Sequence, residues 1–320
     1  MRKARMRPEI LIIILLTAWS SARGETDALE RFNSEYPPAA RRLEERFGTV
    51  KGTCRLSEVE PDGSKPGRES TAEFAVGHGY EKVTIRRKVS GRGADAASGE
   101  FIYCVRSDTG STFYLSRMSG ADSYLVEGIG SSAVDRSAYV TLFGRFLNAH
   151  YGVFGKPLTR SMQAPGYRIV KAEYVTEGES RLIKVDFEVG SQDPRSTISV
   201  VFDPQDGWNI RSSDFRTGNT PGVRISTEVS YGPPRIDGFS LPSRVVSRLG
   251  SGATSTCDFT DWKFESTPEA EFKMSFYNVP DLVDVPKNRK TLYISMFVGA
   301  AAVVFAAALV FRRYGYGPAG

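Results

Sequence analysis

The chain has 320 residues, 25% of them charged, and its 42 Lys and Arg residues outnumber its 37 Asp and Glu residues, giving a formal net charge of +5 at pH 7. The excess of positive charge lies in the first seven residues and on both sides of a C-terminal apolar segment. Without those flanks and Glu9, 33 basic and 36 acidic residues remain, a net charge of about −3. A basic surface for phosphate groups is therefore not expected, which argues against nucleic-acid binding.

The N-terminus has the layout of a secretory signal peptide. A basic start with Arg2, Lys3, Arg5 and Arg7 precedes an apolar stretch at residues 10–18 and the small residues Ser20, Ser21 and Ala22. The apolar stretch is too short to span a bilayer comfortably, so we expect cleavage near Ala22. Residues 1–22 are predicted to be a signal peptide, and residues 24–280 an exported β-rich domain.

Beyond the signal, the pattern predicts one helix followed by many strands. Residues 26–47 have helical spacing, but Pro37 and Pro38 are expected to break the helix. Strands are predicted at residues 50–59, 71–76, 80–88, 101–106, 112–116, 167–176, 181–189, 197–203, 208–214, 223–231, 239–247 and 253–265, bounded by turn residues. Interior helices are expected at residues 131–151 and 156–163. Gly128, Ile129 and Gly130 are interpreted as a turn.

The clearest strand pattern lies at residues 181–189. The apolar residues Ile183, Val185, Phe187 and Val189 alternate with Lys184, Asp186 and Glu188. One face of this strand is therefore expected to be buried and the other exposed to solvent. A Pro204-Gln205-Asp206-Gly207 turn is predicted to close the next hairpin, because proline presets the turn and glycine relaxes its last position. Gly232-Pro233-Pro234 is predicted to separate two later strands. Together these patterns indicate a mainly β, antiparallel α+β fold.

Residues with obvious chemistry are few. The two histidines, His78 and His150, and the three cysteines, Cys54, Cys104 and Cys257, show no zinc-ligand spacing, and no nucleophile elbow or phosphate-binding loop is present. We therefore expect no metal, no cofactor and no enzymatic activity. Among the cysteines, Cys54 and Cys104 form the disulfide pairing to test.

The C-terminal end is predicted to anchor the chain in a membrane. Residues 292–311 contain no charged residue, amide or proline, and a helix of this length is about as long as a bilayer's hydrocarbon core is thick. We predict a stalk at residues 281–290, a transmembrane helix at 291–311 and a cytoplasmic tail at 312–320. Combined with the signal peptide, this layout predicts a single-pass protein of a bacterial inner membrane, with most of the chain on the periplasmic side.

Three segments resemble one family. They are the hairpin from Ser199 to Ile210, the strand start at Gly238-Phe239-Ser240-Leu241-Pro242, and the segment Phe259-Thr260-Asp261-Trp262-Lys263-Phe264. In this order, after an export signal and an N-terminal helix, they resemble the outer-membrane lipoprotein carrier (LolA/LolB/RseB-like) superfamily. The resemblance covers approximately residues 39–276 and implies a curved half-barrel sheet with a few covering helices and an apolar inner face. It places Ile183, Val185, Phe187 and Val189 on that face, and Trp208 is a further candidate ligand-binding residue.

The resemblance implies a non-catalytic function. The leading hypothesis is a membrane-anchored domain that binds a lipid, an acylated protein or a similar apolar ligand inside the half-barrel. An alternative is a regulatory or scaffolding ectodomain that senses or binds an envelope protein through the sheet edge, and a hydrolase is a third possibility. A lipid bilayer and a lipid or lipoprotein are therefore the expected partners.

Overall fold

The computed structural model describes residues 8–61, 68–89, 97–106, 112–130, 145–153, 155–190, 195–218, 222–236 and 238–280. The chain divides into two compact units, Met1–Phe272 and Lys273–Gly320. The described residues of the second unit contain one short 3-10 helix, η4 (Met274–Tyr277), which ends at Asn278 in the left-handed conformation. The predicted stalk, transmembrane helix and tail lie outside the described residues. Within the described ranges, no helix has the length and apolar character that a membrane span requires.

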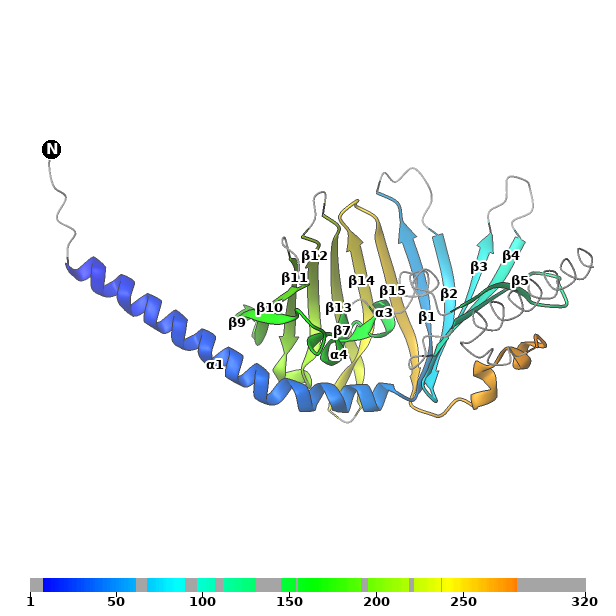
Figure 1. Cartoon of the computed structure of the whole chain (residues 1–320), viewed down its shortest axis with the longest axis horizontal. Coiled ribbons are helices and arrows are strands. Elements are labelled where there is room, and N and C mark those ends of the chain that lie inside the picture. Colours follow the sequence, from blue (N-terminus) through cyan, green and yellow to red (C-terminus); the bar gives the residue numbers. More distant parts are fainter. Residues whose placement is uncertain are drawn as a thin grey trace, which may run out of the picture. The chain divides into compact units, whose positions relative to one another are not determined.

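The first unit is built on one large antiparallel sheet (Figure 1). Thirteen strands are hydrogen-bonded in the order β6-β5-β4-β3-β2-β1-β15-β14-β13-β12-β11-β10-β9 in the described part of the chain. Their bounds are β1 Val50–Val59, β2 Arg68–Gly77, β3 Tyr80–Val89, β4 Ala97–Arg106, β5 Thr112–Met118, β6 Leu125–Gly130, β9 Arg168–Glu177, β10 Ser180–Val189, β11 Ser196–Asp203, β12 Asn209–Arg216, β13 Arg224–Ile236, β14 Phe239–Leu249 and β15 Thr254–Lys263.

The sheet consists of two meanders that meet at a single strand pair. Strands β1 to β6 pair with their sequence neighbours, and so do strands β9 to β15. The two meanders join where β1 pairs with β15, which brings Leu56 opposite Cys257. The sheet curves but does not close, since β6 and β9 are its end strands among the described residues. The predicted mainly β fold with an open curved sheet is confirmed.

Two sequence expectations about strands were wrong. Gly128, Ile129 and Gly130 were interpreted as a turn, but they belong to β6, where β5 supplies the ladder partners. Pro233 and Pro234 were expected to end a strand, yet β13 continues to Ile236. The register shifts between Gly232 and Arg235, so the two prolines occupy a bulge where no ladder amide is needed.

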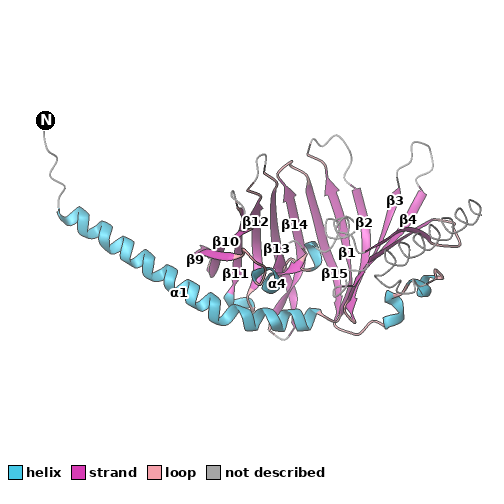
Figure 2. Cartoon of the chain, in the orientation of Figure 1, coloured by secondary structure: helices cyan, strands magenta, loops and turns pink. Residues whose placement is uncertain are grey.

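The N-terminal helix also differs from the expectation. Helix α1 runs without interruption from Pro8 to Phe47, through Pro37 and Pro38 (Figure 2). Each proline removes one backbone hydrogen bond from a helix, but packing against the sheet compensates here, because Tyr36, Ala39 and Ala40 are fully or almost fully buried. The tertiary environment therefore overrides the local helix-breaking signal.

Short elements connect the two meanders. They are helix α3 (Arg145–Leu147), strands β7 (Gly152–Val153) and β8 (Lys156–Pro157), and helix α4 (Leu158–Met162). Helix α4 confirms the helix expected at residues 156–163. Of the helix expected at 131–151, residues 131–144 lie outside the described ranges, and the described end is α3 followed by turns to Tyr151. A 3-10 helix, η2 (Pro204–Asp206), forms the predicted hairpin turn, and another, η3 (Glu269–Phe272), ends the first unit.

Candidate functional site

One face of the sheet carries both large apolar clusters of the first unit, and we call it the inner face. One cluster is centred on β9 to β12 and includes Phe32 and Tyr36 of α1. The other is centred on β1, β2, β14 and β15 and includes Leu43 and Phe47, at the end of the same helix. Helix α1 therefore packs along the inner face from one meander into the other. The opposite, outer face carries most of the ion pairs between strands.

The five residues predicted to bind a ligand lie together on the inner face. Ile183, Val185 and Phe187 are completely buried, Trp208 is 3% exposed, and Val189 is half-buried beside them. The register places Ile183 opposite Phe202 and Val185 opposite Val200, so the apolar row continues onto β11. The two-residue period thus predicted the correct face, and the structure groups all five residues in one cluster.

Aromatic side chains of α1 cover this cluster. The Phe32 ring lies 5.3 Å from Phe202, 5.9 Å from Trp208 and 6.1 Å from Phe187, measured between ring centroids. Tyr36 stacks on Phe32 at 4.9 Å and also contacts Phe202. Burial raises the pKa of Tyr36 well above its usual value. The predicted residues consequently contact the protein's own helix, and a ligand could reach them only if Phe32 and Tyr36 moved.

Polar contacts hold α1 at the rim of the sheet. The Tyr174 hydroxyl donates a hydrogen bond to Asp27 Oδ2 over 3.0 Å, and Lys171 Nζ lies 3.5 Å from Glu25 Oε1. Thr159 of α4 bonds to Glu44 near the other end of the helix. The first two of these pairs are exposed and contribute little free energy. The attachment of α1 therefore depends mainly on its buried aromatic side chains.

A row of hydroxyl groups crosses the inner face between apolar positions. Ser213 of β12 pairs with Thr227 of β13, Thr227 pairs with Ser247 of β14, and Ser247 pairs with Ser255 of β15. The next row, two residues along each strand, is apolar and contains Val229, Val245 and Cys257. Nothing in the sequence alone predicted this row, because it appears only when the strand register is known.

Ser247 is the least solvated member of this hydroxyl row. Its side chain is 1% exposed, and its Oγ atom has no hydrogen-bond partner among the described residues. A buried hydroxyl without a partner costs free energy, and native proteins usually satisfy such groups. The row therefore offers hydrogen-bonding capacity in an apolar surrounding, which is suitable for the polar group of an otherwise apolar ligand.

At the other end of the sheet the inner face is aromatic. The rings of Tyr103 and Tyr114 stack at 4.3 Å, and the Arg87 guanidinium lies 4.3 Å from the centre of the Phe101 ring. Burial is the main reason that the pKa of Tyr103 is raised. Ser116 donates a hydrogen bond to Glu127 of β6. These contacts satisfy one another, so this end of the sheet offers less unused hydrogen-bonding capacity than the hydroxyl row does.

The polar cluster at the β11–β12 hairpin serves the fold. Asp203 accepts hydrogen bonds from the amides of Gln205 and Asp206 at the start of η2, and Arg211 Nη2 lies 2.6 Å from Asp203 Oδ2. Asp206 Oδ1 accepts a hydrogen bond from the Ser240 amide of β14. Gly207 has a φ of +66°, and a Cβ atom there would lie 2.4 Å from the Phe239 ring. Buried charges that are paired in this way fasten the hairpin to its neighbour.

The histidines occupy different environments. His150 is fully buried, its ring centre lies 4.0 Å from that of Phe47, and burial lowers its pKa to about 3. His78 is exposed, and its Nε2 atom lies 3.1 Å from the carbonyl oxygen of Thr267. No group of three or more His, Cys, Asp or Glu side chains that could hold a metal occurs in the described ranges.

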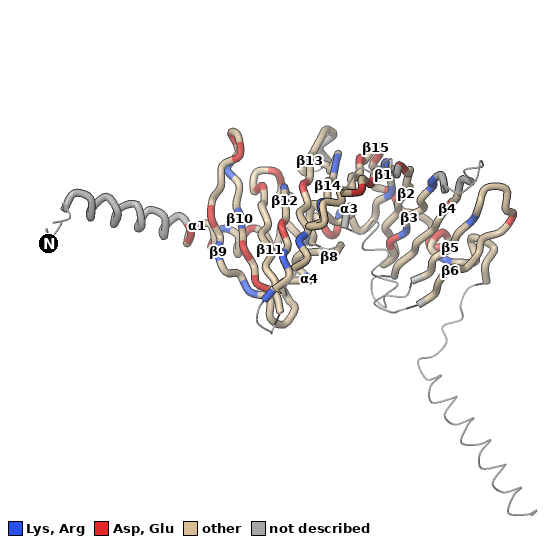
Figure 3. Tube along the Cα trace, turned by 90° about the horizontal axis from the view of Figure 1, so that it is seen from above, with Lys and Arg blue, Asp and Glu red and all other residues tan. Residues whose placement is uncertain are grey.

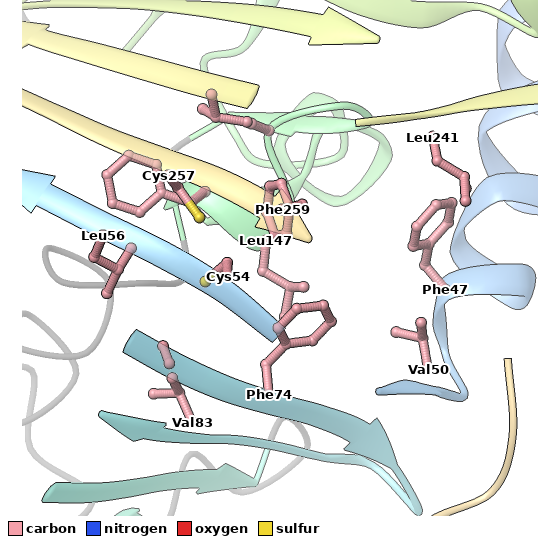
Figure 4. Packing of buried hydrophobic residues seen from close by; sticks show 14 of the residues in the cluster. Phe47, Val50, Cys54, Leu56, Phe74, Val83, Leu147, Leu241, Cys257 and Phe259 are labelled. Atoms are coloured by element: carbon pink, nitrogen blue, oxygen red, sulfur yellow. The ribbon is translucent and has the colours of Figure 1, made fainter. Parts of the chain in front are cut away.

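The cysteine pairing proposed from the sequence is wrong. All three thiols are free and buried. Cys54 belongs to the inner-face cluster, whereas Cys104 packs with Ala75 and Phe272 on the outer face, where its Sγ atom donates to the Phe272 carbonyl oxygen over 3.6 Å. The sheet itself separates the two thiols. The cysteine nearest to Cys54 is instead Cys257, on the adjacent strand β15 (Figure 4).

Charged residues of both signs are interspersed among the described strands. Figure 3 shows Lys and Arg interspersed with Asp and Glu across both meanders. On the outer face, oppositely charged residues of neighbouring strands form ion pairs, as Arg244 does with Asp258 and Arg248 does with Glu228. Such interspersed charges suit a solvated face and give no continuous basic surface for a nucleic-acid backbone in this part of the chain.

Comparisons with known proteins reveal likeness of structure only. No protein family model matches the chain, and no curated protein matches its sequence. A domain from Vibrio parahaemolyticus described as an outer membrane lipoprotein-sorting protein is similar in structure, with a TM-score of 0.45 and 10% identity over 76% of this chain and 97% of that one. A LolA superfamily protein from Nitrosomonas europaea gives a TM-score of 0.41 and 11% identity, over 75% of this chain and 98% of that one. A DUF1329 family protein from Desulfovibrio piger gives a TM-score of 0.45 and 13% identity, over 75% of this chain and 96% of that one. Each of these likenesses is one of structure, at 10 to 13% sequence identity.

Proposed function

We propose that this chain is a non-catalytic, membrane-anchored binding protein that holds an apolar ligand carrying a polar group, such as a lipid or an acylated protein, on the inner face of its sheet. The observation that carries the proposal is the hydroxyl row between two apolar clusters. The Ser247 hydroxyl in this row is buried and has no hydrogen-bond partner among the described residues. An acyl chain requires an extended apolar surface, and its head group requires a hydrogen-bond donor or acceptor within that surface.

The predicted residues have a defined part in this proposal. Ile183, Val185, Phe187, Val189 and Trp208 form the apolar floor on which an acyl chain lies after α1 has moved aside. The aromatic rings of Phe32 and Tyr36 then leave the positions that the acyl chain takes. Because the polar attachments of α1 at the rim are exposed and individually weak, apolar contact with a ligand can replace the contacts of the helix.

Photolabelling of the full chain tests the proposal. The protein is solubilised in detergent and irradiated with a phospholipid that carries a photoactivatable group in its acyl chain, and labelled peptides are identified by mass spectrometry. We expect label in the peptides that contain Ile183 to Val189 and Trp208. Label confined to the apolar segment at residues 292–311 would show that the lipid contacts only the anchor, and the proposal would be wrong.

A linked variant tests whether α1 has to move. Glu25→Cys with Lys171→Cys places two thiols at the rim, where a short bismaleimide joins α1 to β9. The native thiols are buried and react more slowly. The matched control is Arg244→Cys with Asp258→Cys, an exposed pair on the outer face of β14 and β15. We expect the first link to abolish photolabelling of β10 and the control link to leave it unchanged; equal labelling in both would contradict movement of α1.

The sheet-edge alternative has an observation of its own. On the end strand β6, Leu125 is 63% exposed and Val126 is 44% exposed, which is unusual for two consecutive apolar residues of a strand. If the chain senses an envelope protein through this edge, Leu125→Lys abolishes co-purification of that protein and leaves lipid photolabelling unchanged. If lipid binding is the function, the same variant has no effect on either measurement.

The proposed location has a separate test. We propose that residues 1–22 direct export and that residues 291–311 anchor the chain in the bacterial inner membrane, with the sheet on the periplasmic side. Protease added to intact spheroplasts is then expected to digest the sheet. Digestion only after lysis would place the sheet in the cytoplasm.

A further inference from the structure

The junction of the two meanders contains a pair of thiols. Cys54 lies on β1 and Cys257 on β15, the two strands that join the halves of the sheet. Cys257 is opposite Leu56 and Cys54 is opposite Phe259, so the two cysteines are diagonal neighbours on one face. Figure 4 shows both sulfur atoms between the two strands, within the same apolar cluster. This proximity follows from strand pairing, since the two cysteines are 203 positions apart in the sequence.

The environment keeps both thiols reduced and protected in this structure. Cys54 is 3% exposed and Cys257 is completely buried. Burial, together with a hydrogen bond between the two thiol groups, raises the pKa of Cys257 well above its usual value. The thiolate is the reactive form, so oxidation of the folded protein is slow. The two thiols are most accessible while β1 and β15 come together during folding.

We propose that Cys54 and Cys257 form a disulfide bond when the chain folds in the presence of a disulfide oxidant, and that this bond locks β1 to β15. One thiolate attacks the oxidant's disulfide, forms a mixed disulfide and releases one reduced thiol. The second cysteine then displaces the remaining oxidant thiol. The two cysteines lose two protons and two electrons in total, and the oxidant's disulfide becomes two thiols. In the cell this step requires export of the chain, which is part of the proposed function. The chemistry itself does not depend on export.

The local backbone can accommodate the bond. The Cα atoms of a diagonal pair in an antiparallel sheet are about 7 to 8 Å apart, slightly more than a disulfide usually spans, so one strand has to shift towards the other. The register of β1 and β15 already changes between Thr53 and Cys54, and a bulge at this point allows the strand to adjust. Cys104 cannot compete for either partner, because it lies on the outer face.

Refolding of the full chain with counting of free thiols tests the inference. The chain is reduced and unfolded, refolded into detergent with a mixture of oxidised and reduced glutathione, then unfolded again and alkylated. We expect one alkylated cysteine by intact mass, Cys104, and one digestion product in which the Cys54 and Cys257 peptides are linked. Three alkylated cysteines, or a link that includes Cys104, would overturn the proposal.

Single variants provide matched controls. Cys104→Ser is expected to leave no alkylated cysteine, and Cys54→Ser to leave two. If a variant does not refold, full chain trapped with N-ethylmaleimide at cell lysis gives a second measurement, and we again expect one free thiol. Photolabelling by lipid does not depend on thiol counts, so a failure of this inference and a failure of the proposed binding function are distinguishable.

Discussion

The inner face has two regions that are packed in different ways. Beneath the middle of α1, the rings of Phe32, Tyr36, Phe202 and Trp208 interlock, and the neighbouring residues are apolar. Around β14 and β15, the same face contains hydroxyl and thiol groups, among them Ser247 and Cys257, between apolar neighbours. The first region is stabilised by the close packing of its side chains and by the apolar surface area that they bury. The second contains the Ser247 hydroxyl, which has no hydrogen-bond partner among the described residues, and two free thiols, and such groups are the ones that distinguish one ligand or one redox state from another.

The largest expected effect concerns the interlocked region. Phe32→Ala removes the ring that contacts Phe187, Phe202 and Trp208, and we expect it to lower the free energy of unfolding by about 3 to 5 kcal/mol. Denaturant unfolding followed by tryptophan fluorescence measures the change. Asn33→Ala, on the exposed side of the same helix, is the control and should change stability by less than about 0.5 kcal/mol. Equal effects of the two variants would show that α1 does not pack in this way.

The second prediction concerns pH at the junction of the two regions. Burial lowers the pKa of His150 to about 3, so the folded state resists protonation of this ring. In the unfolded chain the ring takes up a proton below its ordinary pKa of about 6.5. Stability is therefore unaffected by this residue above pH 6.5 and falls as the pH decreases from 6.5 towards 3, by up to about 1.4 kcal/mol per pH unit. Urea unfolding at pH 7 and pH 5 measures the slope.

Two variants show whether His150 causes that slope. His150→Gln removes the titrating ring and should make stability less dependent on pH between 7 and 5, whatever it does to stability itself. The matched control is His78→Gln, at an exposed histidine, and the slope of His150→Gln is compared with the slope of this variant. An unchanged slope in His150→Gln would show that this histidine is not buried in its neutral form.

The third prediction concerns the unused hydroxyl. Ser247→Ala removes a buried hydroxyl that has no hydrogen-bond partner in the described part of the chain, and we expect it to raise the free energy of unfolding by about 1 kcal/mol and to weaken lipid photolabelling. Ser243, on the same strand, donates a hydrogen bond to the Ser230 carbonyl, so Ser243→Ala should lower stability and leave labelling unchanged. A loss of stability in Ser247→Ala would indicate that this hydroxyl already has a structural partner.

The smallest expected effect concerns the attachment of α1 at the rim. Asp27→Asn weakens the acceptor for the Tyr174 hydroxyl, and because this contact is exposed we expect a global change below about 0.5 kcal/mol. Local opening should still increase, so the backbone amides of α1 near Asp27 should exchange hydrogen faster in the variant. Glu30→Gln, which faces solvent on the same helix, should leave the exchange rates unchanged.

Local patterns predicted most of the strands. The expected strand at 50–59 has the bounds of β1, and the alternation at 181–189 assigned Ile183, Val185 and Phe187 to the buried face. These predictions succeeded because a half-buried strand imposes a period of two on its own residues. The helix break at Pro37 and Pro38 and the turn at Gly128 were predicted by equally local rules, and they were wrong because packing or strand pairing outweighed a preference of a few kcal/mol.

By itself, the sequence determined most of the segments that are strands, which face of β10 is buried, and that the described body is mainly β, because each of these follows from the order of neighbouring residues. Only the tertiary structure decided that β1 pairs with β15, that α1 covers the predicted residues, and that Ser247 and the Cys54–Cys257 pair lie on one inner face. These contacts join residues far apart in the chain, and their register depends on the free energy of the whole packed sheet.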